Sequence, residues 1–151
     1  MKTFFSVKIS HACSLLSLLM LGLGLSPTAT LAQTKLYSPV PLQTGKQISD
    51  RLSEDDIPTG QGGFARDYRV TLTAGDQVVV DLISDNFDTI VALMAMDGTT
   101  VAENDDGPDG STNSLLFTRI NKAGTYIVRV RGFGESASGP FKLKVTRLKP
   151  I

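Results

Sequence analysis

The sequence predicts an all-β protein built as a sandwich of antiparallel sheets. Between residues 45 and 147, short runs alternate apolar and polar side chains, as strands with one buried face do. Turn residues separate these runs at intervals typical of β-sandwiches, and residues 33–151 show no convincing helical period. A closed barrel is the alternative fold, because alternation does not distinguish one closed sheet from two packed sheets.

The first half of this region contains five of about eight predicted strands. The opening run is weak, whereas the second is clear because Tyr68, Val70 and Leu72 share one face. The fourth run is apolar on both faces, which is typical of a central strand. Asp97-Gly98 then predicts a two-residue hairpin into the fifth strand. We expect these strands at residues 47–52, 67–72, 77–84, 89–96 and 99–103.

Three further strands are expected in the second half, at residues 115–120, 126–131 and 141–146. In the first of them, Leu115, Leu116 and Phe117 follow one another, so the pattern does not decide which face is buried. A polar loop over residues 104–113 precedes this strand, and a Gly/Ser loop over residues 132–139 separates the last two.

Residues 1–32 have the pattern of a secretory signal peptide. Lys2 and Lys8 give a positive start, residues 15–25 form an apolar run, and Thr30-Leu31-Ala32 places small residues where signal peptidase cuts. We expect cleavage after Ala32, a leader or linker over residues 33–44 and the domain over residues 45–151. The mature chain, without a transmembrane segment, is then periplasmic or extracellular. A retained N-terminal anchor is the alternative.

Cleavage would also remove the only Cys and the only His, Cys13 and His11. The remaining chain could not build a Cys nucleophile, a Ser-His-Asp triad or a thiolate or His-ligated metal site. Its 13 basic and 15 acidic residues give a formal charge of −2, which does not favour nucleic-acid binding.

Several short motifs in a fixed order give residues 45–147 a family resemblance. The most specific are Asn86-Phe87-Asp88-Thr89 and Asn104-Asp105-Asp106-Gly107. The weaker ones are Leu52-Ser53-Glu54-Asp55, Phe64-Ala65-Arg66-Asp67-Tyr68, Ala74-Gly75-Asp76-Gln77-Val78, Asp97-Gly98 and Ala123-Gly124-Thr125-Tyr126. Together they resemble the bacterial pre-peptidase C-terminal domain.

The resemblance implies a jelly-roll-like β-sandwich that accompanies secreted peptidases and helps their secretion, localisation or substrate contact. The family is similar to the collagen-binding domains of clostridial collagenases, some of which bind calcium. Here we expect a stand-alone secreted domain, because no peptidase sequence precedes it.

Acidic and amide side chains in two loops form the first candidate site. If the hairpin around Asp97-Gly98 forms, the loops before and after it meet at one end of the sandwich. Their oxygens suit Ca²⁺, although Asp residues also hydrogen-bond their own turns, which is the alternative. The candidate ligands are Asp85, Asp88, Asn104, Asp105, Asp106 and Asp109. The resemblance implies a second cluster at Glu54, Asp55, Asp56 and Asp67.

The second candidate site follows from an uneven charge distribution. Residues 33–112 carry 5 basic and 14 acidic residues, whereas residues 113–151 carry 8 basic and 1 acidic. If the last two strands pair, their cations form one basic patch for an anionic polysaccharide, lipid headgroups or an acidic protein. Otherwise they are solvated charges that pair with the acidic half. The patch would contain Arg129, Arg131, Lys142 and Lys144.

Phe133, in the loop between the last two strands, is the third candidate. An aromatic side chain at a loop tip can anchor a partner, but we expect it to fold back over the sandwich edge.

The expected function is that of a secreted non-catalytic module, stabilised by calcium if the acidic loops bind it. Its partner would be a secreted protein, including an enzyme that it assists, or an anionic envelope polysaccharide. A small hydrolase that uses Asp residues as acid and base is one alternative, and a structural envelope protein without a ligand is another.

Overall fold

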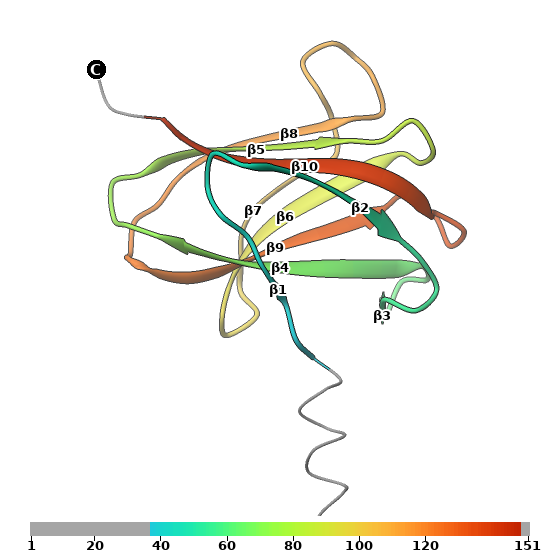
Figure 1. The fold of residues 1–151 in the computed structure, drawn as a ribbon, viewed down its shortest axis with the longest axis horizontal. Helices are drawn as coiled ribbons and strands as arrows, with labels where there is room; N and C mark the ends of the chain where they lie inside the picture. The colour runs from blue at the N-terminus through green and yellow to red at the C-terminus, as the bar shows by residue number, and fades with distance from the viewer. Residues whose placement is uncertain (1–36, 149–151) are drawn as a thin grey trace, which may run out of the picture.

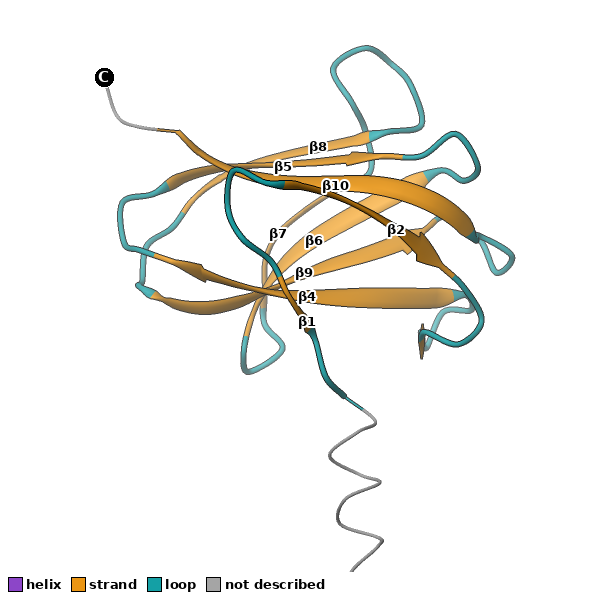
Figure 2. Cartoon of the chain, in the orientation of Figure 1, coloured by secondary structure: helices purple, strands orange, loops and turns teal. Residues whose placement is uncertain are grey.

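The computed structural model describes residues 37–148 as two β-sheets packed face to face (Figure 1). This part of the chain contains strands, turns and loops but no helix (Figure 2). The predicted all-β sandwich is confirmed, and the barrel alternative is wrong because the strands divide between two separate sheets. Over the same residues there is consequently no apolar helix of membrane-spanning length. The predicted signal peptide lies outside the described residues.

The chain crosses repeatedly between the two sheets, which form the upper and lower layers of Figure 1. One sheet has the order β1-β4-β9-β6-β7, with β3 also paired to β4, and the other has the order β2-β10-β5-β8. The six strands of the first sheet are β1 (Val40–Pro41), β3 (Ile57–Pro58), β4 (Phe64–Leu72), β6 (Thr89–Ala95), β7 (Thr100–Asn104) and β9 (Gly124–Gly132). The four strands of the second are β2 (Gln47–Leu52), β5 (Gln77–Ile83), β8 (Ser114–Arg119) and β10 (Gly139–Leu148).

The hydrophobic core lies between the sheets and consists of the alternate residues of their strands. Tyr68 of β4 reaches Phe141 of β10 across the core, with the rings edge to face and 6.3 Å between centroids. The undecided face of β8 is resolved by its pairing with β5: Leu116 packs inward beside Val80, whereas Phe117 points outward and is 60% exposed.

All eight predicted strands are present, and two very short strands were not predicted. β1 and β3 have two residues each, too few for alternation to show. β1 pairs with β4 in parallel, and Leu42 after it is buried and donates its N–H to Arg69 O at 2.9 Å. Residues 40–42, placed in the leader by the sequence pattern, therefore contribute to the folded sheet.

The last two long strands, β9 and β10, do not pair with each other. The prediction of a single basic patch assumed that they do. β9 lies between β4 and β6, and β10 lies between β2 and β5 in the opposite sheet. The chain between them crosses from one sheet to the other. The alternation specified which residues face inward, but it carries no information about which strands are neighbours.

The crossing begins at Gly132, where a side chain has no room. A Cβ atom there would lie 2.3 Å from the Ala137 Cβ and 2.9 Å from a ring carbon of Phe87. We expect Gly132→Ala to lower the free energy of unfolding by about 1–3 kcal/mol, measured by urea denaturation. Gly124→Ala, at the other end of β9, is the control because its Cβ would meet nothing within 4 Å. Equal effects of the two changes would contradict the crowding argument.

Candidate functional site

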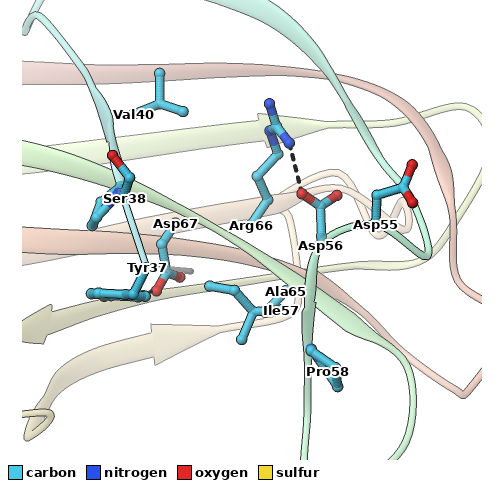
Figure 3. A pocket seen from close by; sticks show the side chains of 11 residues that line it. Tyr37, Ser38, Val40, Asp55, Asp56, Ile57, Pro58, Ala65, Arg66 and Asp67 are labelled. Carbon is cyan, nitrogen blue, oxygen red and sulfur yellow. Dashed lines mark hydrogen bonds and ion pairs between the residues drawn. The ribbon is translucent and has the colours of Figure 1, made fainter. Parts of the chain in front are cut away.

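A groove with a volume of about 660 Å³ lies at the outer edge of β4 (Figure 3). This edge is paired at two places, since β3 pairs with residues 64–65 and β1 with residues 68–69. Arg66 and Asp67, between these pairs, line the groove together with Ala65. Its volume is in the range of ligand-binding clefts in proteins.

Two short segments form the walls of the groove. One is residues 37–40, which lead into β1, and the other is residues 55–58, which end in β3. The apolar part of the lining comes from both segments, with Pro39 and Val40 on one side and Ile57 and Pro58 on the other. Asp55 is an exposed carboxylate on the same lining.

Asp67 anchors one wall through a buried ion pair. Its side chain is 1% exposed and opposite Arg129 in the pairing of β4 with β9. Arg129 donates from Nε and Nη2 to the two carboxylate oxygens, both at 2.8 Å, and the Tyr37 hydroxyl donates to Oδ2 at 3.0 Å. These hydrogen bonds raise the pKa of Arg129 above its usual value. Burial and the charge of Asp67 raise the pKa of Tyr37.

Arg66 anchors the other wall and also links the two sheets. It donates from Nη1 to Asp56 at 2.6 Å and from Nε to Asp50, on β2 of the opposite sheet, at 2.9 Å. The hydroxyl of the core residue Tyr68 donates to the same Asp50 oxygen, at 2.8 Å. Burial alone would raise the pKa of Asp50, but the hydrogen bonds from Tyr68, the Arg51 N–H and Arg66 together lower it. Burial and the bond to Asp50 raise the pKa of Tyr68 far above its usual value.

These ion pairs determine the environment of the second predicted calcium cluster. Asp56 and Asp67 each have an arginine partner, so their charges are already neutralised within the protein. Glu54 and Asp55 are exposed to solvent. The four side chains therefore occupy different environments.

The loops of the first predicted cluster do meet at one end of the sandwich, but hydroxyl and amide groups join them. The Thr89 and Ser114 hydroxyls are 2.7 Å apart, and the Ser84 N–H donates to the Asn113 side chain at 2.9 Å. Thr89 N–H also donates to the Thr112 carbonyl at 2.9 Å. The predicted hairpin between these loops is confirmed by the pairing of β6 with β7.

Several predicted ligands hydrogen-bond their own turns. Asn104 donates to the carbonyls of Asp106 and Leu115, both at 2.9 Å, and Asp109 accepts bonds from the Ser111 hydroxyl and N–H. The bonds from Ser111 lower the pKa of Asp109. Asp85, Asp88, Asp105 and Asp106 are exposed. Over residues 37–148 no group of three or more His, Cys, Asp or Glu side chains is placed to hold a metal ion, and calcium binding stays a prediction.

The four cations of the predicted basic patch lie on opposite faces of the sandwich. Arg129 and Arg131 point outward from β9, whereas Lys142 and Lys144 point outward from β10 in the other sheet. A single patch is therefore wrong, because β9 and β10 belong to different sheets. Phe133 is 70% exposed, so the expectation that it folds back over the edge is also wrong. Partner binding by these residues stays a prediction.

The sequence analysis did not identify Tyr37, Ile57 or the arginine network as parts of a site. The sequence did contain one indication of the arginine network. Arg66 lies on the same side of β4 as the core residues Tyr68 and Val70, since alternate residues of a strand share a face. A charged side chain on the inward face of a strand requires a polar partner. The partner, Asp50, is on another strand, and its proximity depends on the fold.

We expect Tyr68→Phe to lower the free energy of unfolding at pH 7 by about 1.5–3 kcal/mol, because it removes a hydrogen bond to a carboxylate. Because the pKa of Tyr68 is raised in the folded protein, its hydroxyl ionises above pH ~10 in the unfolded chain but not in the folded one. The free energy of unfolding of the wild type should therefore fall as the pH rises above ~10. The difference between the two proteins should therefore shrink above pH ~10.

Urea denaturation between neutral and alkaline pH measures both effects. Tyr126→Phe is the control, since that hydroxyl donates to a neutral group, the Lys122 carbonyl, at 2.6 Å. A pH dependence of Tyr68→Phe that matches the wild type would contradict the assignment.

We expect Arg129→Ala to lower the free energy of unfolding by about 3–5 kcal/mol, because it leaves the buried Asp67 carboxylate unpaired. Arg131→Ala is the matched change on the same strand. Its partner Glu103 is 45% exposed and 3.2 Å away, so a loss under about 1 kcal/mol is expected. Similar losses for the two variants in thermal or urea unfolding would show that burial of Asp67 is unimportant.

Part of the chain is similar to a known protein family. Residues 65–132 match the model of the bacterial pre-peptidase C-terminal domain. No curated protein matches the sequence. The matched residues run from β4 to the end of β9 and include the floor of the groove.

Solved structures share the fold at low sequence identity. The pre-peptidase C-terminal domain of a Bacillus anthracis collagenase has 12% identity and a TM-score of 0.55, covering 72% of this chain and 94% of that chain. Aeromonas hydrophila PliG, a periplasmic inhibitor of g-type lysozyme, has 15% identity and a TM-score of 0.55, covering 74% and 96%. Salmonella Typhimurium PliG has 11% identity and a TM-score of 0.50, covering 74% and 100%. The resemblance inferred from the motifs is confirmed: residues 65–132 match the model of the bacterial pre-peptidase C-terminal domain, and the fold is similar to that of a solved domain of this family.

Proposed function

We propose that this chain is an exported, non-catalytic module that binds a segment of another exported protein in the groove beside β4. The observation that carries the proposal is the groove itself. It has apolar side chains on both walls and, at residues 66–67 between β3 and β1, a short stretch of the β4 edge that pairs with no strand of residues 37–148 on that side. Extended peptides bind such edges through main-chain hydrogen bonds, while neighbouring pockets select their side chains.

The groove is held in shape before any ligand binds. Asp67 accepts hydrogen bonds from Arg129 and Tyr37, and Arg66 donates to Asp56, so each wall is tied to β4. A site that is already ordered loses less conformational entropy when it binds. This supports recognition of a specific partner.

The comparisons and the predicted signal peptide support an exported protein partner. PliG proteins are described as periplasmic inhibitors of g-type lysozyme, so the fold serves in them to act on another protein. Residues 1–32 have the pattern of an export signal. A g-type lysozyme is therefore a reasonable first probe.

A hydrolase is the less favoured function. Carboxylate catalysis of glycoside hydrolysis needs one acid with a raised pKa. In this protein hydrogen bonds lower the pKa of Asp50, Asp76, Asp97 and Asp109. These shifts are in the opposite direction to that needed by a general acid.

The test is capture by the immobilised exported chain, first of purified g-type lysozyme and then of proteins from the periplasmic and secreted fractions of the producing bacterium. We expect the wild type to retain one protein reproducibly and Ile57→Asp to lower its retention about tenfold, because a charge replaces an apolar wall.

Met96→Asp is the control, since Met96 is exposed at the β6–β7 turn and does not line the groove. Retention that Ile57→Asp leaves unchanged would place the binding site elsewhere. Retention of polysaccharide alone would contradict a protein partner.

A further inference from the structure

The outer face of the four-stranded sheet is a second surface with features of a binding site, and we call it the Phe117 face. Its centre is formed by outward residues of the adjacent strands β5 and β8. Phe117 lies opposite Val79 in their pairing, Leu115 is the next outward residue of β8, and Ile83 ends β5. Phe117 is 60% and Ile83 39% exposed. Phe117, Val79 and Leu115 are neighbours on this face, and Ile83 lies beyond Asp81 at the end of β5. Exposed apolar side chains grouped on one face can mark an interaction surface.

Cations border this apolar centre. In the pairing of β10 with β5, Lys142 lies opposite Ile83 and Lys144 lies opposite Asp81. Arg119 is the next outward residue of β8 beyond Phe117. Arg51, opposite Pro140 in the pairing of β2 with β10, is a fourth cation of this sheet. Four positive charges therefore accompany Asp81 on the face and Asp85 just beyond the end of β5.

These cations differ from those on the opposite face of the sandwich. Arg129 and Arg131 form ion pairs with Asp67 and Glu103. None of the ion pairs among residues 37–148 includes Lys142, Lys144 or Arg119. Their charge is therefore available to an anionic partner.

A pocket of about 240 Å³ adjoins the face at the end of β5. Ile83 and Lys142 belong to both the face and the pocket. The rest of its lining includes the buried Phe141, Pro140 and the exposed carboxylate Asp85. This volume is smaller than that of most clefts that enclose a whole ligand. It suits a single side chain of a larger partner.

We propose that the Phe117 face docks an acidic protein partner, which inserts an apolar side chain into this pocket and places carboxylates beside Lys142 and Lys144. An apolar centre with a charged rim is the usual arrangement of a protein interface, and an exposed aromatic residue is a common energetic centre. A polysaccharide without apolar groups would leave Phe117 poorly covered. The surface is independent of the β4 groove, which lies on the other sheet.

The experiment uses the exported chain labelled with ¹⁵N and a short synthetic peptide in which one Phe is flanked by Glu residues. We expect the peptide to shift amide resonances of β5, β8 and β10. Phe117→Ala and the double change Lys142→Glu with Lys144→Glu should each weaken binding about tenfold. Added salt should weaken binding to the wild type more than to the double variant.

Two matched variants and two matched peptides make the result decisive. Arg131→Glu and Ile57→Asp change the opposite face and the groove, so binding of the peptide should be unchanged. Peptides with Lys in place of Glu, or Ala in place of Phe, should bind weakly.

The proposal is overturned if the Glu–Phe peptide does not bind, if the Lys peptide binds equally, or if Phe117→Ala has no effect while the fold is intact. Phe117-dependent binding to phosphatidylglycerol vesicles without binding of the peptide would also overturn it, in favour of a membrane. The capture experiment with Ile57→Asp tests only the groove, and the peptide experiment tests only the Phe117 face. Either proposal can therefore be contradicted without affecting the other.

Discussion

The hydroxyl of Tyr68 joins the hydrophobic core to the groove. The ring of Tyr68 packs against Phe141 between the sheets, while its hydroxyl donates to Asp50 at 2.8 Å. Asp50 belongs to β2 and also accepts from Arg66, which belongs to β4 of the other sheet. The distance between the sheets is therefore coupled to the position of Arg66. A change in core packing here would move the groove floor, because close-packed interiors transmit small displacements.

Two neighbouring residues of β4 hold the two walls because their side chains point to opposite sides of the strand. Arg66 reaches Asp56 on the wall formed by residues 55–58, and Asp67 reaches Tyr37 on the wall formed by residues 37–40. Both acids have arginine partners, so their burial does not leave an isolated charge. The same pairing ties both walls of the groove to β4.

The two outer faces of the sandwich use charge differently. On the six-stranded sheet, Arg129 and Arg131 form ion pairs with acids of the same face, so their charges are balanced within the protein. On the four-stranded sheet Lys142 and Lys144 border exposed apolar side chains. This difference in charge pairing is the reason for proposing an acidic protein partner for the four-stranded face.

The all-β class, the eight predicted strands and the Asp97-Gly98 hairpin could be predicted from the sequence, because alternation and turn residues are local properties of the chain. The family resemblance also rests on local motifs, and residues 65–132 match the family model. The sequence also marked Asp56 and Asp67 as candidate calcium ligands, which stays a prediction, but it did not indicate their arginine partners, which are brought to them only by folding. The tertiary structure alone decided that β9 and β10 belong to different sheets, that Arg129 and Lys142 lie on opposite faces, and that Phe133 is exposed. Strand neighbours depend on packing between residues far apart in the chain, and a period of two specifies an inward face without specifying which strand lies beside it.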